Sequence, residues 1–422
     1  MGNISKGLAL ILVLVVSVLS VFVNAPVGIA QTSTPVNGII TSDSTWTQAN
    51  SPYSLAGPVA VNQGVTLTIE PGTTVDLNSY YIQVNGTLTA IGTSSNPIYI
   101  NNGSGYSIGE IYTPNFGITL TSLSNSWNEQ TSSGSIIENA VFNSAQIGIY
   151  NSPKLANTNG ANIFVLGSSP TISNNSNCVL NVYGGSPLIL DNYVNEIDVT
   201  YGSPVISNNT IADKNGAYGI QLEGGIGTVT INDNIISGAF DEGCINGGGN
   251  ATIVRNLLIN NSPAGAAIKI GGPQTTFNIQ NNTLVGYYGI SGSGGIQSTL
   301  ADNNFQNNSI YSIYWNTPNN LDATNNWWGT IDERVISTRI FDNKNNFNLG
   351  TVNFVPFLTA PNPQVPNENT PTSTPASSIS SSPSIPEFPF VICLTIVVIL
   401  STIAISVYRD RLKHRDYIAL WG

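Results

Sequence analysis

The sequence contains few charged residues. Only 8% of its 422 residues are Asp, Glu, Lys or Arg, and the formal net charge is −11. The stretch from Gln31 to Pro389 contains seven basic and 21 acidic residues, a balance of −14. An acidic surface without basic clusters excludes nucleic acid as a partner.

Histidine and cysteine are also scarce. The only histidine, His414, follows a long apolar run near the C-terminus. The main body therefore has no imidazole to act as acid, base or metal ligand. Cys178 and Cys244 lie in repeat units too far apart for a disulfide, so both are expected to be small buried side chains.

A short repeated unit dominates the middle of the chain. It consists of an apolar residue, two variable residues, Asn, any residue and a second apolar residue, as in Ile206 to Ile211. Spacings of 17 to 36 residues between successive asparagines indicate a solenoid with a fixed coil and variable loops. The repeated asparagines are Asn139, Asn175, Asn192, Asn209, Asn234, Asn256, Asn282, Asn303 and Asn326.

The unit predicts two short strands that meet at a corner marked by the asparagine. Apolar residues on both sides can point inward, and asparagine tolerates left-handed backbone angles. Stacked coils place equivalent side-chain amides about 4.8 Å apart, so they can bond up and down the stack. With Gly 41 and Pro 23, no window resembles a helix pair. The predicted fold class is therefore all-β.

The asparagine-bearing units resemble the repeats of right-handed parallel β-helix proteins, the architecture of pectate lyases and of many surface proteins. Gly64 to Thr73 resembles the first coils of such proteins, and Asn325 to Gly329 resembles their closing segment. The resemblance covers about Tyr53 to Leu358 and implies a right-handed parallel β-helix solenoid. It says little about chemistry, because the matching residues are those that build coils.

The two ends of the chain predict export and anchoring. Lys6, the apolar run Leu8 to Val23 and the small residues before Gln31 predict a signal peptide, with an uncleaved anchor as the alternative. Phe388 to Val407 is long enough to span a membrane. Basic residues behind it place the tail in the cytoplasm and the β-helix outside, at the cell surface.

The junction Pro386-Glu387-Phe388 resembles the sorting tails of archaeal surface proteins processed by archaeosortases, although permanent anchoring is slightly favoured. The predicted segments are residues 1–30, signal peptide; 31–52, lead-in and N-terminal cap; 53–358, parallel β-helix; 359–386, Pro/Ser/Thr-rich stalk; 387–408, transmembrane helix; and 409–422, basic cytoplasmic tail.

The resemblance also implies where chemistry would lie, because catalytic β-helices act on polysaccharides with acidic residues on one strand face. Glu196 lies four residues after Asn192 and Asp213 four after Asn209, so the two are expected to stack, with Asp198 on the same face. These carboxylates could bind calcium or serve as the acid and nucleophile of a glycosidase. The alternative is that they are ordinary surface acids.

Other chemistry of such proteins is not expected. The chain lacks the Gly-His-Gly motif of polygalacturonase-like β-helices, and Met1 is its only methionine, which argues against a copper site. Asp233 and Arg255 directly precede repeated asparagines and predict an ion pair between coils.

Aromatic residues gather in the last coils, where their rings could stack on sugars or, as we favour, close the end of the solenoid. The candidate ligand-binding residues are Tyr287, Tyr288, Tyr311, Tyr314 and Trp315. Possible glycosylation acceptors in Asn-x-Ser/Thr sequences are Asn85, Asn102, Asn174, Asn208, Asn250, Asn260, Asn281 and Asn307.

These observations favour a surface-anchored β-helix that binds extracellular or cell-wall glycan, or that is adhesive or structural, without turnover. The alternative is a polysaccharide lyase or glycoside hydrolase. Calcium is the one cofactor that the carboxylates suggest. The sequence identifies neither the ligand nor the oligomeric state.

Overall fold

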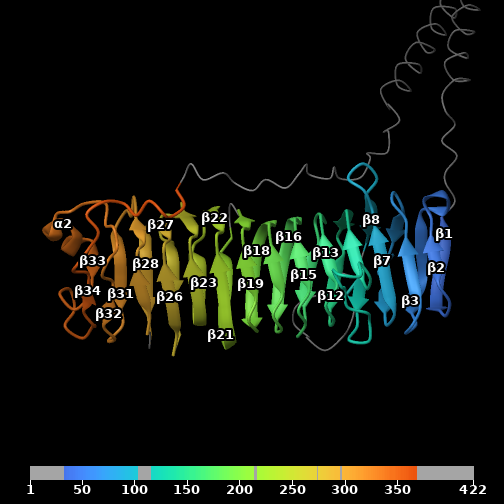
Figure 1. Cartoon of the computed structure of the whole chain (residues 1–422), viewed down its shortest axis with the longest axis horizontal. Coiled ribbons are helices and arrows are strands. Elements are labelled where there is room, and N and C mark those ends of the chain that lie inside the picture. The colour runs from blue at the N-terminus through green and yellow to red at the C-terminus, as the bar shows by residue number, and fades with distance from the viewer. Residues whose placement is uncertain (1–32, 103–115, 213–215, 273, 295–296, 368–422) are drawn as a thin grey trace, which may run out of the picture. The chain divides into compact units, whose positions relative to one another are not determined.

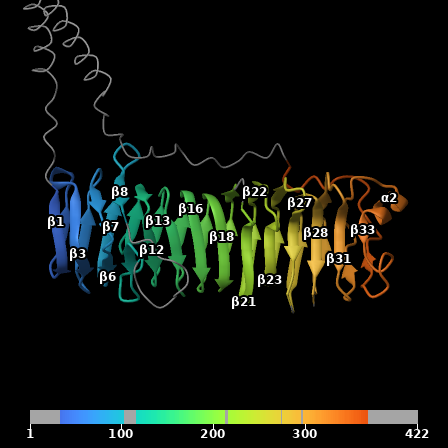
Figure 2. The same ribbon diagram turned by 180° about the vertical axis from the view of Figure 1, so that it is seen from behind.

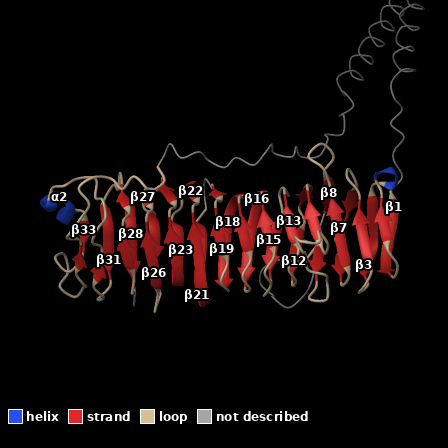
Figure 3. Ribbon diagram, viewed as in Figure 1, coloured by secondary structure: helices blue, strands red, loops and turns tan. Residues whose placement is uncertain are grey.

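The computed structural model describes residues 33–102, 116–212, 216–272, 274–294 and 297–367. Within them the chain is built of short strands that stack coil upon coil in parallel pairs (Figure 1). The helical segments described are a 3-10 turn, η1 (Gln48–Asn50), and α2 (Glu333–Thr338), at the two ends of the stack (Figure 3). This all-β solenoid is consistent with the predicted parallel β-helix.

Each coil contributes strands to three faces, and every strand pairs in parallel with its equivalents in the neighbouring coils; Figure 2 shows the stack from behind. Six long strands turn a corner and belong to two faces. Face 1 contains β1 (Thr34–Ile40), β3 (Tyr53–Val61), β6 (Ile82–Val84), β9 (Ile118–Leu120), β12 (Gln146–Ile149), β14 (Asn162–Val165), β16 (Ser176–Tyr183), β18 (Tyr193–Tyr201), β21 (Tyr218–Asn232), β23 (Gly243–Val254), β25 (Ala266–Ile270), β28 (Tyr288–Ser293), β31 (Tyr311–Asn316) and β33 (Ile340–Phe341).

The other two faces complete each coil. Face 2 contains the C-terminal parts of β21 and β23 with β2 (Ser44–Trp46), β4 (Thr66–Ile69), β7 (Thr87–Ile91), β10 (Ile136–Glu138), β13 (Lys154–Ala156), β15 (Thr171–Ser173), β17 (Leu188–Leu190), β19 (Val205–Ser207), β26 (Thr276–Gln280), β29 (Thr299–Ala301), β32 (Leu321–Asp322) and β34 (Val352–Asn353). Face 3 contains the N-terminal parts of β1, β3, β16 and β18 with β5 (Thr74–Asp76), β8 (Ile98–Asn101), β11 (Ala140–Asn143), β20 (Thr210–Ile211), β22 (Ile235–Gly238), β24 (Leu257–Asn260), β27 (Thr283–Val285) and β30 (Asn304–Phe305).

The core is a set of apolar columns that run along the stack. On face 2, Ile189, Ile206, Ile231 and Ile253 pair in register, and all four are fully buried. Their neighbours in sequence point outward, as the period of two of a strand requires. Burying each such side chain contributes about 1.5–3 kcal/mol, so stability accumulates coil by coil.

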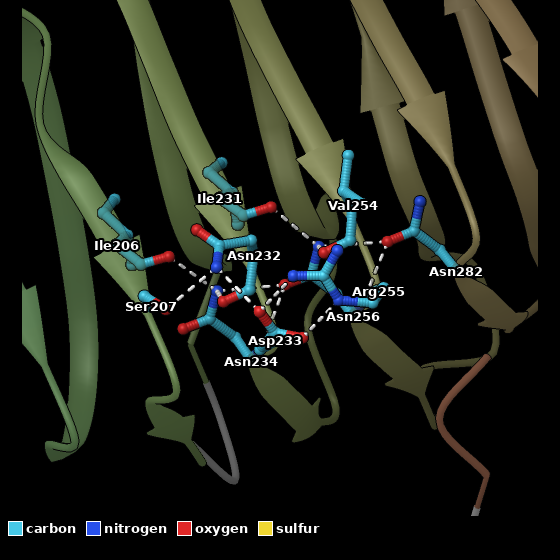
Figure 4. Close-up of polar contacts among 10 residues, drawn as sticks. All are labelled: Ile206, Ser207, Ile231, Asn232, Asp233, Asn234, Val254, Arg255, Asn256 and Asn282. Atoms are coloured by element: carbon cyan, nitrogen blue, oxygen red, sulfur yellow. Dashed lines mark hydrogen bonds and ion pairs between the residues drawn. The ribbon is translucent and has the colours of Figure 1, made fainter. Parts of the chain in front are cut away.

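A ladder of buried asparagine amides joins the coils at the corner between faces 2 and 3. In Asn234, Nδ2 donates to Ile206 O at 2.9 Å and to Asn256 Oδ1 at 2.9 Å (Figure 4). Its Oδ1 accepts from Asn209 N at 2.9 Å. The same bonds link each member to the next. The ladder contains Asn175, Asn192, Asn209, Asn234, Asn256, Asn282, Asn303 and Asn326.

The left-handed backbone expected at the ladder asparagine lies one residue earlier. Asn208 has φ 58° and Arg255 has φ 54°, each directly before a ladder asparagine. Asn139, with φ 50°, occupies this earlier position and is not a ladder member. The first place in the ladder belongs to Thr158, whose hydroxyl and backbone N–H both donate to Asn175 Oδ1.

The predicted ion pair between coils is confirmed. Arg255 Nε and Nη2 each donate to a carboxylate oxygen of Asp233 at 2.7 Å (Figure 4). The hydrogen bond from Arg255 holds the pKa of the Asp233 carboxyl below its ordinary value. Because both side chains are partly exposed, the pair contributes about 1 kcal/mol or less.

Both ends of the solenoid are closed by aromatic residues. Trp46 is buried and stacks on Tyr53 with ring centroids 4.9 Å apart, as expected for a residue that covers the first coil. At the other end Trp328 is buried between Phe305 and Phe354. Helix α2 follows, and its N-terminus is capped by Asp332, which accepts from the backbone N–H of two helical residues.

The first residues of the predicted stalk are docked against the solenoid. Asn362 Nδ2 donates to Asn281 Oδ1 at 3.0 Å and to Asp302 O at 2.7 Å. Its backbone N–H donates to Asn304 Oδ1 at 2.9 Å, and Val365 is buried. Residues 359–367, the last described residues, therefore pack on the last coils of the solenoid.

Other predictions fall partly or wholly outside the described residues. The signal peptide, the membrane span and the basic tail lie outside them, and no helix within them is long and apolar enough to cross a membrane. Residues 103–115 are not described, and an antiparallel bridge further along the chain joins Asn128 and Ser133. Cys178 and Cys244 are free and buried, as predicted.

We predict that Asn234→Leu lowers the free energy of unfolding by about 1–3 kcal/mol, because it leaves buried backbone and amide groups of three coils without partners. Urea unfolding followed by circular dichroism measures the loss. Asn278→Leu is the matched control, since Asn278 is half-buried on face 2 and its Oδ1 accepts from an exposed Thr299 hydroxyl. Equal stability of Asn234→Leu and the parent would contradict a structural role for the ladder.

Candidate functional site

One outward row on face 1 contains a predicted carboxylate near one end and a predicted tyrosine near the other. Its residues occupy successive register positions about 4.8 Å apart. From the acidic to the aromatic end the row reads Asn181, Asp198, Gln221, Asn246, Lys269, Ser291, Tyr314 and Phe341. We call these eight residues the face 1 row.

Asp198 is the carboxyl group of this row, and its pKa is perturbed. Its Oδ1 is buried without a hydrogen-bond partner. Burial raises the pKa of Asp198 to about 6, and the negative charges of Glu223 and Glu196 add to the shift. Such a pKa shift is typical of functional carboxyl groups, although buried structural acids show it too.

Two tyrosines border this acidic cluster. The Tyr218 hydroxyl donates to Glu196. Burial raises the pKa of Tyr218, and the negative charges of Glu196 and Asp198 raise it further. Burial likewise raises the pKa of Tyr183. Glu196 and Asp198 are therefore together on one face, as the sequence predicted, within a partly buried setting of phenols and carboxylates.

Asp213 lies outside the described residues. Its predicted stacking with Glu196 assumed that equal distances from Asn192 and Asn209 mark equal positions in neighbouring coils, and the register of the strands shows that they do not. Ile197 pairs with Ile220, although Ile197 follows Asn192 by five residues and Ile220 follows Asn209 by 11. The coil after Asn209 is therefore longer by six residues. Equal offsets from successive ladder asparagines do not mark equal positions on face 1 at this coil.

Amides and an ion pair fill the middle of the row. Asn246 Nδ2 donates to Gln221 Oε1 at 2.7 Å, and Lys269 pairs with Glu242. Lys269 lies three strand spacings, about 14 Å, from Asp198. The other ion pairs described engage Lys154, Arg255 and Lys344 with carboxylates away from Asp198.

The aromatic end is a cluster of half-buried rings on β28, β31 and β33. Tyr314 stacks on Phe341 with centroids 4.7 Å apart, and Tyr288 stacks on Tyr311 at 6.4 Å. Tyr288 and Tyr314 are 5.2 Å apart, and Tyr287 meets Tyr288 edge to face at 4.8 Å. Four of the five predicted aromatic residues thus meet on the outer surface.

The fifth, Trp315, belongs to the core. Its side chain is fully buried, and its Nε1 donates to Asn319 O at 2.6 Å. Tyr314 and Trp315 are consecutive in β31, so they point to opposite sides of the face. The aromatic residues of the last coils therefore divide between closing the solenoid, as Trp315 and Trp328 do, and forming an outer cluster.

The described residues do not form a metal centre. Among them, no group of three His, Cys, Asp or Glu side chains is placed to hold a metal ion. Burial and the neighbouring charges of Glu223 and Glu196 raise the pKa of Asp198. The calcium site predicted from the sequence also includes Asp213, which lies outside the described residues, so it stays a prediction.

The possible glycosylation acceptors differ in accessibility. Asn260 is buried, and its amide bonds to the backbone of Phe240, Ser262 and Ala266, so the folded chain does not present it to solvent. The remaining acceptors are exposed or half-buried: Asn85, Asn102, Asn174, Asn208, Asn250, Asn281 and Asn307.

Glu223, Tyr218 and Phe341 are among the members of the site that were not predicted from the sequence. Glu223 and Tyr218 lie in β21 and belong to the acidic cluster. The sequence did not indicate this, because the loop before β21 changes the spacing from the ladder asparagine. Phe341 joins the aromatic cluster from β33, which follows helix α2. The only sequence signal for Phe341 was its place in a short apolar pair, Ile340-Phe341, after the helix.

Comparisons with known proteins add no assignment: no protein-family model matches the chain, and neither the curated proteins nor the solved structures gave a match.

We predict that Asp198→Asn changes stability in a pH-dependent way. The raised pKa means that the folded chain holds this proton more tightly than the unfolded chain. That stabilisation is complete below about pH 4, the ordinary pKa of aspartate, and is lost as the pH rises through about 6. The variant should therefore match the parent at low pH and unfold at a higher temperature at pH 7 and above.

After allowance for solvent screening at this partly exposed side chain, the difference at neutral pH is on the order of 1 kcal/mol. Thermal unfolding at a series of pH values measures it. Glu223→Gln should move the transition to lower pH by removing a neighbouring charge, whereas Asp241→Asn, at an exposed carboxylate, serves as the control. A pH-independent difference for Asp198→Asn would contradict the assignment.

Proposed function

We propose that this protein is a right-handed parallel β-helix anchored at the cell surface, and that it binds extracellular or cell-wall glycan along the face 1 row without turnover. The observation that carries the proposal is the outer cluster of Tyr287, Tyr288, Tyr311 and Tyr314, which adjoins a row of amides and one lysine. Partly exposed rings supply apolar faces for sugar rings. The amides supply donors and acceptors for hydroxyl groups.

The geometry of the row supports a chain-like ligand. Its residues repeat about every 4.8 Å along the solenoid axis. A polysaccharide that lies along this axis would contact Tyr314 and Ser291 first and then Lys269, Asn246 and Gln221. The strands that hold these side chains are paired on both sides, so the surface is preorganised and little ordering entropy is lost on binding.

Surface anchoring is the second part of the proposal, and it is supported by the sequence. The apolar run at residues 8–23, the span at residues 388–407 and the basic tail orient the β-helix outside. The resemblance of Pro386-Glu387-Phe388 to archaeosortase sorting signals and of the coils to pectate-lyase-like proteins suggests an archaeal surface protein. An adhesive or structural role uses the same exposed face.

The alternative function is that of a polysaccharide lyase or glycoside hydrolase. The raised pKa of Asp198 favours it, because a carboxyl group with a pKa of about 6 can act as a general acid. A lyase also requires a base, yet Lys269 is about 14 Å from Asp198 along the row and is paired with Glu242. Binding without turnover therefore has the stronger support.

We predict that Tyr314→Ala weakens glycan binding about 3- to 10-fold, because an aromatic stacking contact contributes about 0.5–1.5 kcal/mol. A glycan array identifies the ligand, and isothermal titration calorimetry on the full-length protein measures the affinity. Tyr314→Phe should retain most of it. Phe347→Ala, at a ring that is 95% exposed outside the cluster, is the control.

Two results would contradict this function. Unchanged affinity in Tyr314→Ala would remove the aromatic cluster from the binding surface. Release of reducing ends or unsaturated products from a bound polysaccharide, if abolished by Asp198→Asn, would establish the enzymatic alternative.

We predict that protease added to intact cells digests the β-helix and spares an epitope placed after Arg415, because the basic tail remains inside. Immunoblotting before and after detergent permeabilisation measures both parts, and permeabilised cells should lose the epitope. Loss of the epitope from intact cells with an undigested β-helix would reverse the proposed orientation.

A further inference from the structure

A groove on face 2, near the N-terminal end of the solenoid, is separate from the face 1 row. It has a volume of about 540 Å³, within the range of small-molecule sites. Strands β4, β7 and β10 form its floor, and residues 125–134 form a wall beside them. Its lining residues are Thr66, Thr87, Thr89, Ile91, Asn125, Ser126, Trp127, Ser132, Ser133, Gly134 and Ile136.

The wall of the groove is fixed to neighbouring coils. Asn125 Nδ2 donates to the Thr87 hydroxyl at 2.7 Å, and its backbone N–H donates to Gly86 O at 3.0 Å. The backbone N–H of Trp127 donates to Ser152 O at 2.9 Å. Gly134 has φ 110°, and a Cβ there would lie 2.0 Å from Ser126 O, so this tight return requires glycine.

The floor offers regularly spaced hydroxyl groups. Thr66 pairs with Thr87, and Thr89 lies two residues further along β7 on the same outward side. The paired threonines are about 4.8 Å apart. Ile91 and Ile136 extend the floor with apolar surface, and the half-buried Trp127 stands in the wall. The lining thus combines hydroxyl groups, an indole and small apolar patches.

The groove has no charged lining residue, and Lys154, which pairs in register with the lining residue Ile136, forms an ion pair with Glu129. Lys154 Nζ lies 3.0 Å from Glu129 Oε1 and 5.6 Å from the centroid of the Trp127 ring. The hydrogen bond from Lys154 lowers the pKa of Glu129, so this carboxylate stays ionised and paired. A charged ligand would therefore find no counter-charge in the groove.

We propose that this groove is a binding site for a neutral saccharide unit. A sugar has hydroxyl groups for the threonine and serine side chains and an apolar C–H face for the indole. Because the wall is already held in place, binding requires little rearrangement. The site lies on another face and on other coils than the tyrosine cluster, so it stands or fails independently of the function proposed above.

The test is calorimetric titration of the full-length protein with cellobiose, maltose, lactose and N,N′-diacetylchitobiose, and with digalacturonate as the charged comparison. We expect at least one neutral disaccharide to bind and digalacturonate to bind more weakly. Trp127→Ala should weaken binding about 10-fold through loss of the stacked ring. Thr89→Val, which keeps the shape of the side chain, should weaken it about 3- to 10-fold.

Two controls assign the effect to this groove. Thr252→Val makes the same change in the same outward row of face 2, outside the groove, and Tyr314→Ala alters the face 1 row; both should retain the affinity. If Trp127→Ala fails to fold, Thr89→Val decides. The proposal is overturned if none of the four neutral disaccharides binds, if digalacturonate binds best, or if Thr89→Val binds as the parent does.

Discussion

The structure depends on one buried interaction, the amide ladder between faces 2 and 3. In the ladder asparagines before Asn326, Nδ2 donates to a strand carbonyl and to the side-chain amide oxygen of the next coil, and Oδ1 accepts two hydrogen bonds from the coil before, as for Asn192 and Asn209. A corner buried without these bonds would leave strand carbonyls unsatisfied, at a cost of about 1–3 kcal/mol each. The ladder thus fixes the register of successive coils while the loops elsewhere vary in length.

Much of the fold could be predicted because the ladder leaves a simple trace in the sequence. Few other residue types can replace a buried asparagine whose amide joins two coils and whose apolar neighbours in sequence point into the core. The unit therefore recurs from Asn175 to Asn326. The trace is ambiguous where two roles favour the same residue. Asn139 adopts the left-handed conformation that usually precedes a ladder asparagine, and asparagine suits that place too. Arg255 shows that ladder geometry can also impose this conformation on another residue.

The candidate site was less predictable, because it depends on distances from the ladder that loops alter. Glu196 and Asp198 lie in β18, where the path from the ladder is short, and their common face follows from the alternation of a strand. Asp213 lies where the coil gains six residues before Ile220, and no pattern in the sequence shows on which side of the strand such residues fall. The sequence prediction grouped Trp315 with the four tyrosines, and it was wrong for Trp315, which is fully buried. Strand alternation alone would have separated the two neighbours, because Tyr314 and Trp315 are consecutive in β31 and point to opposite sides.

A ladder that carries the stability leaves the outward rows free to differ from coil to coil. Each row is a line of side chains at the strand spacing, and a change in one outward side chain alters little of the core beneath it. In the face 1 row, Asp198 lies several coils from Tyr314, and the threonine groove lies on another face, so no shared contact requires these sites to act together. A solenoid of this kind can therefore present distinct surfaces for long glycans, whose repeating units can contact several coils at once. Affinity then comes from the number of weak contacts that a rigid stack holds in line, and not from one deep pocket.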